Sequence, residues 1–312
     1  MPDYLYTIFS ILTSGLPCSL LALGIFLTFR LLDFADLTAE GSFLIGGATC
    51  LTIIKNGGNP VVATLAALLA GAVCGLLTGL LHTKLHIPKL LSGIITMTAT
   101  ASIALVIMGT TSDLSAFTNL VSLGKDDVTI YSALQQGNAW NIVIESAVMA
   151  VILIIVMFAL YFFFGTEYGM AIRNTGMNEK MARSNGINTN LAIIICVTIS
   201  NALIGLAGAL FAQDMRSMDV KSASGFLVIG LASILIGEAI FGKRSFKNWI
   251  ISVALGAIVY FTIVTYAIKL HFPTQLKNLL YAILITIALC LPLIKSGFKK
   301  LFKKKPKEAV AQ

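Results

Sequence analysis

Long apolar runs separated by short polar intervals cover almost the whole chain. A run of about 20 apolar residues suits a helix that crosses the roughly 30 Å hydrocarbon core of a membrane. Such runs lie at about residues 5–27, 60–81, 90–109, 141–164, 191–212, 226–242, 249–268 and 277–294. The pattern therefore predicts an all-α, polytopic membrane protein with about eight to nine transmembrane helices.

A shorter apolar run, Ser42–Ile54, follows a stretch that is acidic and rich in glycine. Asp33, Asp36 and Glu40 enter the edge of a membrane span there. Irregular backbone at membrane depth occurs where protein or a water-filled cavity surrounds it. We therefore expect a bent or broken helix near residues 33–47, beside a solute pathway. The alternative is an interfacial loop in which the acids cap a helix.

One polar interval, Gly165–Asn190, combines charge with an apolar helical face. Its sequence, GTEYGMAIRNTGMNEKMARSNGINTN, is too charged to lie in hydrocarbon. Met177, Met181, Ala182 and Ile187 form the apolar face of the predicted amphipathic helix. A short helix of this kind beside a membrane is typical of a surface that binds another protein.

Composition agrees with the membrane class. Hydrophobic residues make up 57% of the chain, charged residues 12%, and the mean hydropathy is +0.90, which excludes an ordinary soluble domain. No linker or soluble domain is visible, so we predict one transmembrane domain over residues 1–295, including the loop at 165–190. A Lys-rich tail follows at 296–312.

The basic residues predict the orientation, since Lys and Arg favour the cytoplasmic side of a membrane. The tail from Lys295 onwards is rich in lysine. Counting back through the spans places the basic residues at 84–89, 173–183 and 243–247 on the same side. We expect a cytoplasmic C-terminus, and an external N-terminus if the short run crosses. Topology and anionic lipids account for the net charge of +8 without nucleic acid.

Polar side chains within the predicted spans are candidates for a translocation pathway, because intramembrane polar groups often mark functional sites. The candidates are Asp36, Thr38, Glu40, Ser42, Thr96, Thr98, Asn201, Ser233 and Glu238. In the hydroxyl-rich stretch Leu91–Ser102, bonding back to carbonyls of the same helix is an equally good interpretation. Pairing of Glu238 with Lys243 or Arg244 is favoured slightly over a gate. An interhelical hydrogen bond is the alternative for Asn201.

The sequence contains no recognisable catalytic or metal-binding motif. It contains no P-loop, no nucleophile elbow and no pair of catalytic carboxylates. His82 and His86 are four residues apart without a third ligand, and the five cysteines have no close spacing. We therefore expect no enzymatic activity, cofactor or metal. A separate ATPase subunit is a possible source of energy.

Four segments resemble the membrane subunits of bacterial ABC importers in the branched-chain amino acid and ribose permease superfamily. LDFADLTAEGSFLIGGA at 32–48 is similar to an early segment of that superfamily, and GTEYGMAIRNTGMNEKMARSNGIN at 165–188 to its ATPase-docking loop. Two further segments are closest to the tryptophan/tyrosine-type permeases of that superfamily. They are HTKLHIPKLLSGIITMTATASIALVIMG at 82–109 and LVIGLASILIGEAIFG at 227–242.

The resemblance implies a multi-pass permease of a bacterial plasma membrane with three kinds of partner. These are cytoplasmic ABC ATPases, an extracytoplasmic solute-binding lipoprotein and a second permease copy, with the pathway along the interface between copies. The implied ATPase-coupling residues are Arg173, Asn174, Met177, Asn178, Lys180, Met181, Ala182, Arg183, Ser184, Gly186 and Ile187. The expected solute is small, an amino acid in the first place, with aromatic amino acids among the candidates. The alternatives are an ion-coupled carrier without an ATPase and a membrane scaffold.

Overall fold

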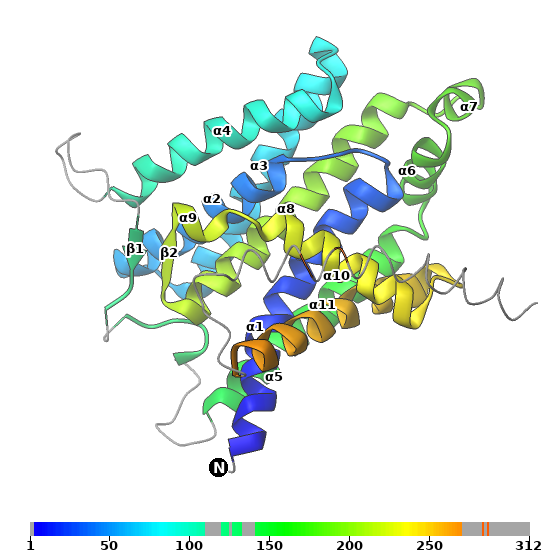
Figure 1. Ribbon diagram of the computed structural model, residues 1–312. Coiled ribbons are helices and arrows are strands. Elements are labelled where there is room, and N and C mark those ends of the chain that lie inside the picture. Colours follow the sequence, from blue (N-terminus) through cyan, green and yellow to red (C-terminus); the bar gives the residue numbers. More distant parts are fainter. Residues whose placement is uncertain are drawn as a thin grey trace, which may run out of the picture.

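The computed structural model describes residues 3–109, 120–124, 127–132 and 141–269, together with residues 283 and 286. The predicted span at 277–294 and the Lys-rich tail thus lie largely or wholly outside the described residues. The elements, shown in Figure 1, are α1 (Asp3–Phe26), the π-helical η1 (Leu27–Leu31), α2 (Thr38–Lys55), α3 (Pro60–Leu85), α4 (Lys89–Met108), β1 (Leu120–Ser122), α5 (Asn141–Phe163), α6 (Glu167–Met177), α7 (Glu179–Ser184), α8 (Thr189–Met215), β2 (Ser217–Asp219), α9 (Val220–Ala223), α10 (Phe226–Phe241) and α11 (Phe246–Lys269).

Six helical segments in the described part of the chain are long and apolar enough to cross a membrane. They are Tyr6–Leu31, Pro60–Leu85, Lys89–Met108, Asn141–Phe163, Thr189–Met215 and Phe246–Ala267. The helix α10 is apolar but has only 16 residues. The polytopic, mainly helical class is therefore confirmed. The total of eight to nine spans stays a prediction.

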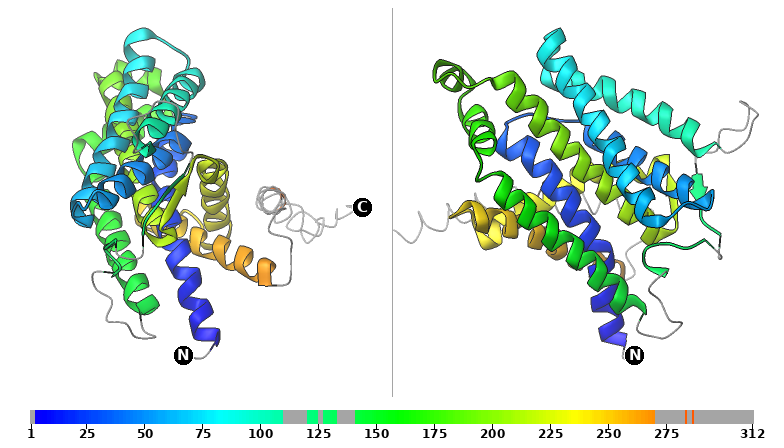
Figure 2. Two further views of the ribbon diagram at one scale, coloured as in Figure 1. Left: turned by 90° about the vertical axis from the view of Figure 1, so that its left-hand side faces the viewer. Right: turned by 180° about the vertical axis from the view of Figure 1, so that it is seen from behind.

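Helix α8 lies at the centre of the fold and packs against α1, α2 and α3 (Figures 1 and 2). Small residues allow this close approach. A Cβ atom added at Gly71 or Gly75 of α3 would overlap the backbone of α8, and one at Gly208 would overlap the carbonyl of Phe43 in α2. At these positions glycine therefore permits the close packing of α8 against α2 and α3.

The outer faces of α3, α4 and α5 carry large apolar side chains that the chain itself does not cover. Exposed examples are Leu65 and Leu69 on α3, Val106 on α4, and Ile154 and Phe158 on α5. In a soluble protein such a surface would be a liability, whereas lipid tails solvate it well. These faces suit contact with lipid or with another membrane-embedded chain.

The predicted break in the second apolar region is present at residues 32–37, between η1 and α2. Asp33 has a positive φ of 52°, and the backbone N–H of Thr38 donates to Asp36 Oδ1 at 2.9 Å. The chain therefore turns at Asp33 before α2 begins. From Thr38 to Lys55 the helix is continuous, so the break occupies only the first part of the predicted range.

The two ends of the bundle differ in charge. The end that holds α6, α7 and the α3–α4 turn carries Arg30, Lys84, Lys89, Arg173, Lys180, Arg183, Lys243, Arg244 and Lys247. The opposite end, with β1 and β2, carries Lys55, Arg216, Lys221 and Lys269 among the described residues. We call these the basic end and the hairpin end. The excess of basic residues favours a cytoplasmic position for the basic end.

Two short strands, which the sequence pattern did not predict, close the hairpin end. Val121 of β1 lies opposite Met218 of β2 in an antiparallel pair. Arg216 ties the segments together by donating to the carbonyl oxygens of Gly124 at 2.6 Å and Asp127 at 2.9 Å. Tyr131 is buried against α8, where its hydroxyl donates to the Leu210 carbonyl at 3.2 Å, and burial raises its pKa well above the usual range. Residues 120–124 and 127–132 are therefore anchored on the bundle.

Candidate functional site

A two-helix platform, Glu167–Ser184, projects from the basic end and consists of α6 and α7 (Figure 1). Side-chain caps define its helices. Thr166 Oγ1 accepts from the Gly169 N–H at 3.4 Å, and Asn178 Oδ1 accepts from the Met181 N–H at 3.1 Å. The chain bends at Asn178, where φ is −160°. The amphipathic helix expected in Gly165–Asn190 is therefore found as two helices, because Asn178 ends α6 and starts α7.

Helix α6 is seated directly on the membrane domain. Gly176 contacts the backbone of Leu31 so closely that an added Cβ would overlap the Leu31 carbonyl oxygen. Ile172 is fully buried, and the Arg173 guanidinium lies 4.9 Å from the centre of the Phe246 ring in α11. Displacement of α6 would therefore act on η1 and α11 through direct contacts.

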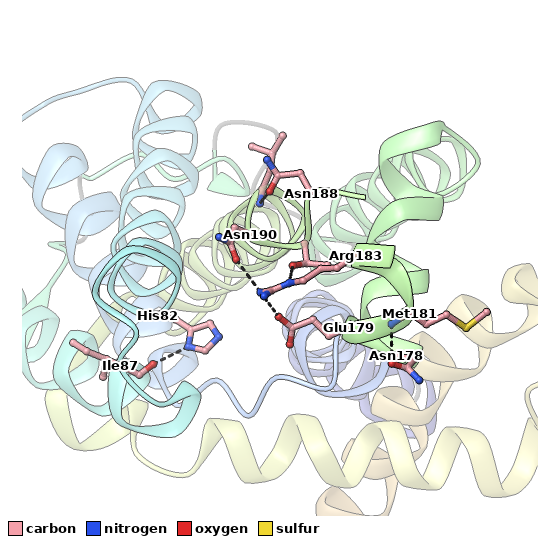
Figure 3. A network of polar contacts seen from close by, with 10 residues as sticks. His82, Ile87, Asn178, Glu179, Met181, Arg183, Asn188 and Asn190 are labelled. Carbon is pink, nitrogen blue, oxygen red and sulfur yellow. Dashed lines mark hydrogen bonds and ion pairs between the residues drawn. The ribbon is translucent and has the colours of Figure 1, made fainter. Parts of the chain in front are cut away.

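Arg183 fastens α7 to the start of α8. Its Nε donates to Thr189 Oγ1 at 2.7 Å, and its Nη2 donates to Glu179 Oε1 at 2.7 Å. Nη2 also donates to Asn190 Oδ1 at 3.4 Å, so the guanidinium lies between α7 and α8 (Figure 3). Arg183, one of the implied ATPase-coupling residues, is thus held by contacts within the chain, and its role in ATPase coupling stays a prediction.

The apolar residues of the platform divide into an outward and an inward set. Met177 is 85% exposed and Met181 is 62% exposed, and the Met181 side chain points away from Arg183 (Figure 3). Ala182 is buried, and Ile187 lines a cavity of about 260 Å³ between α6 and α8. Met181 and Ala182 lie on different faces of α7, and Ile187 follows the turn at Gly186.

The remaining platform candidates lie on the surface or in its turns. Asn174, Lys180 and Ser184 are exposed. Gly186 has a φ of +80° with open space around it, so it provides the left-handed turn after α7. The turn leads to Asn188, whose side chain caps α8 by accepting from the Leu191 N–H at 3.2 Å.

Several candidate pathway residues form a closed network between α2, α3 and α8. Asn201 Nδ2 donates to Asp36 Oδ2 at 2.7 Å, while Ser42 Oγ donates to Asn201 Oδ1 at 2.7 Å. The hydroxyls of Thr38 and Thr78 are 2.7 Å apart. Asp36, Thr38, Ser42 and Asn201 are fully buried in the single chain. Their role in the pathway stays a prediction, and a solute does not reach them in this arrangement.

The hydroxyl groups on α4 and α10 bond back to their own helices. Thr96 Oγ1 donates to the Ser92 carbonyl at 3.1 Å, and Thr98 Oγ1 donates to the Ile95 carbonyl at 2.9 Å. Ser233 does the same with the Ile229 carbonyl at 2.8 Å. Thr96 and Ser233 are buried, whereas Thr98 is exposed on the outer surface of α4. Of these three, Thr98 alone is exposed on the surface of the single chain.

Glu238 joins three elements at the basic end. Its Oε2 accepts from Arg30 Nη2 at 2.6 Å, and its Oε1 accepts from Trp249 Nε1 at 2.8 Å. The expected partners were Lys243 and Arg244. Arg30 is the partner instead because the fold brings η1 beside the end of α10, a proximity that no local sequence signal indicates.

Replacement of Glu238 with alanine is expected to loosen the contact between η1, α10 and α11. Two donors would lose their acceptor, and a charge-assisted hydrogen bond contributes about 1.5–3 kcal/mol. We expect a lower midpoint of thermal unfolding in detergent, with a smaller loss for Glu238→Gln, which keeps an acceptor for Trp249. Equal midpoints for Glu238→Ala and the wild-type chain would contradict this role.

His82 and His86 complete the α3–α4 turn. His82 Nδ1 lies 2.7 Å from the Ile87 carbonyl oxygen (Figure 3), and its ring packs edge-on against Phe34. His86 adopts a left-handed conformation with φ of +56° at the end of α3. In the described part of the chain no group of three or more His, Cys, Asp or Glu side chains is placed to hold a metal ion. The contacts found for the two histidines shape this turn.

Glu40 differs from the other acidic residues in the region. It is half-buried, and its Oε1 accepts from the backbone N–H of Gly225 at 2.9 Å. The carboxylate lies at a cavity of about 180 Å³ between α2, α4 and α9. Glu40 therefore has a cavity in front of its carboxylate.

These features define the class of the protein: a polytopic helical membrane protein with a two-helix platform at its basic end. The chain belongs to the family described as branched-chain amino acid transport system / permease component, which it matches over residues 7–289. It is therefore a multi-pass permease subunit of an ABC transporter in a bacterial plasma membrane. Membership of this family implies separate ATPase subunits and a substrate-binding protein as partners.

Relatives support this assignment. The tyrosine transport system permease protein of Clostridioides difficile is 35% identical over 295 residues, covering 94% of each chain. The galactofuranose transporter permease protein of Escherichia coli is 25% identical over 92% of this chain and 78% of its own. A probable branched-chain amino acid transport permease protein of Methanocaldococcus jannaschii is 27% identical over 78% of this chain and 77% of its own. No solved structure matches this chain significantly.

Proposed function

We propose that this chain forms the translocation pathway of an ABC importer and that the α6–α7 platform receives the ATPase. The exposure of Met177 and Met181 on a platform seated against the membrane domain carries this proposal. Exposed methionines are suited to a protein groove, because their flexible side chains adapt to its shape. The location of the platform at the basic end supports a cytoplasmic partner.

The seat of the platform provides a route for coupling. Gly176 abuts Leu31 at the end of the first span, and Arg173 stacks on Phe246 at the start of α11. When nucleotide binding moves the ATPases, the platform transmits that movement to these two spans. Arg183 keeps α7 and α8 together during the movement, since it holds Glu179, Thr189 and Asn190.

The proposed solute is an amino acid, with L-tyrosine as the first compound to test. This choice rests on the relative named a tyrosine transport system permease protein. An extracytoplasmic binding lipoprotein would deliver the solute at the hairpin end, where Arg216 anchors the loop around Gly124. A second copy of the chain would complete the pathway, since the exposed apolar faces of the helices are suited to contact between membrane-embedded chains.

Replacement of Met181 with lysine tests the docking surface. A charge placed in an apolar groove costs about 2 kcal/mol or more when it replaces an anchor residue. That loss corresponds to about 30-fold weaker association with the ATPase. Copurification of the ATPase from detergent-solubilised membranes measures the effect, together with ATP-driven uptake in proteoliposomes.

Met215→Lys is the matched control, because Met215 is an exposed methionine at the hairpin end of α8. We expect it to retain the ATPase. Normal ATPase association of Met181→Lys would rule out the proposed platform contact. Accumulation of solute by the purified chain alone under an ion gradient would instead favour a secondary carrier.

A further inference from the structure

The cavity beside Glu40 presents a carboxylate next to the break between α9 and α10. It is lined by Glu40, Gly41, Leu44, Met97, Ala101, Val220, Ala223 and Ser224. Its volume of about 180 Å³ is about the volume that six molecules of liquid water occupy. Apart from the carboxylate and the Ser224 hydroxyl, its lining side chains are apolar. The cavity therefore offers a carboxylate to a positively charged group of a solute and apolar side chains to its apolar part.

The cavity lies deep in the membrane domain. Gly41 packs against Thr100, which is eleven residues after the start of α4, or about 16 Å along the helix axis. That position is close to the middle of a hydrocarbon core of about 30 Å. A helical element is interrupted beside the cavity, since α9 is separated from α10 by Ser224 and Gly225. Solute sites in transporters commonly form where broken helices meet near the midplane.

The Glu40 carboxylate has no basic partner among the described residues. The ion pairs found among the described residues are Arg30–Glu238 and Arg183–Glu179, and neither includes Glu40. Glu40 Oε1 is bonded to the Gly225 N–H, and Oε2 accepts no hydrogen bond from the described residues. A carboxylate at membrane depth is costly unless a positive group or water compensates it. Oε2 is therefore placed to receive a cation from the cavity.

We propose that Glu40 binds the ammonium group of an amine-bearing solute, such as an amino acid, while Leu44, Met97 and Ala101 contact its apolar side chain. The inference deepens the proposed function and rests on it. An organic ammonium fits better than a metal ion, because a bound metal needs several oxygen ligands and Glu40 is the only carboxylate that lines this cavity. An ammonium group needs only one carboxylate partner, and the apolar lining contacts the apolar part of the solute.

Glu40→Gln tests the charge without removing the local structure. Glutamine retains an oxygen that can accept from the Gly225 N–H, so the contact between α2 and the start of α10 survives. Asp33→Asn is the matched control, since Asp33 is an exposed acid with φ of 52°, a conformation that asparagine tolerates. Both variants are purified as the full permease with its ATPase, without the binding protein.

Radioligand binding is measured with L-tyrosine, L-tryptophan and L-leucine, each paired with its analogue that lacks the amino group. We expect at least one of these amino acids to bind the wild-type complex and the Asp33→Asn complex. Glu40→Gln should weaken that binding at least tenfold. The matching analogue without the amino group should not compete. Binding should be equal in sodium and potassium buffers, because the site takes the ammonium and not a metal ion.

The inference is overturned if no amino acid of the panel binds the wild-type complex, or if binding survives Glu40→Gln unchanged. A second variant, Ala101→Phe, should block the cavity and abolish the same binding. ATPase copurification and ATP-driven uptake are measured on the same preparations. Uptake of a solute that lacks an amino group, with no effect of Glu40→Gln, would refute the ammonium site and leave the ABC importer function standing. Failure to bind an ATPase would refute the proposed function instead.

Discussion

Replacement of Gly176 with leucine is expected to abolish ATP-driven transport. The α carbon of Gly176 lies against the Leu31 backbone, and a Cβ atom there would overlap the Leu31 carbonyl oxygen. Backbone cannot give way as a flexible side chain can, so α6 must leave its seat. The platform would then lose its contact with the first span. We expect undetectable ATP-driven uptake in proteoliposomes, while the spans still insert in the membrane.

Gly57→Asn provides the control for this experiment. Gly57 has a φ of +79° and open space around it at the hairpin end, and asparagine tolerates that conformation. Expression and uptake of this variant should match the wild-type chain. A Gly176→Leu variant that transports normally would show that the seat of α6 on Leu31 is not required for coupling. Cysteine cross-linking between α6 and η1 would then show whether the contact persists.

Replacement of Asp36 with alanine is expected to destabilise the membrane domain strongly. Asp36 accepts from the Thr38 N–H and from Asn201 Nδ2, and all three groups are buried. Each stranded donor costs about 1–3 kcal/mol when no water can replace its partner. Thermal unfolding in detergent should show a large decrease in the midpoint, and Asp33→Asn should remain close to the wild-type value.

A double-mutant cycle gives a sharper test of this network. If Asp36 and Asn201 act as a unit, the effect of Asp36→Ala should be smaller in an Asn201→Ala background. Neighbours in one buried network typically show a coupling free energy of about 0.5–3 kcal/mol. Additive effects of the two changes would contradict the network. A small effect of Asp36→Ala alone would mean that water reaches the site.

The same network explains why polar residues within the spans were difficult to interpret from sequence. Asp36 and Glu40 are four residues apart and both carry a carboxyl group, so a sequence pattern treats them alike. Packing separates them, because Asp36 points into the α2–α8 interface while Glu40 lies at a cavity. Exposure to a solute is a property of the assembled bundle. A local pattern does not contain it.

For the platform, too, the sequence predicted one part and the tertiary structure decided the rest. The alternation of charged and apolar residues in Gly165–Asn190 predicted a helix outside the membrane, and α6 and α7 are found there. The pattern did not show the bend at Asn178, which depends on a side-chain cap to Met181. It also placed Ile187 with the outward methionines, although Ile187 lines the cavity between α6 and α8.

The sequence by itself determined that this protein is a helical membrane protein, since run length and hydropathy depend only on local composition and on the thickness of a membrane. Its motifs also identified the permease family. The tertiary structure alone decided which polar groups meet: Glu238 with Arg30, Asp36 with Asn201, and Glu40 with a cavity. These contacts join residues far apart in the chain, and helix packing sets them through close approaches at glycine that a one-dimensional pattern does not encode.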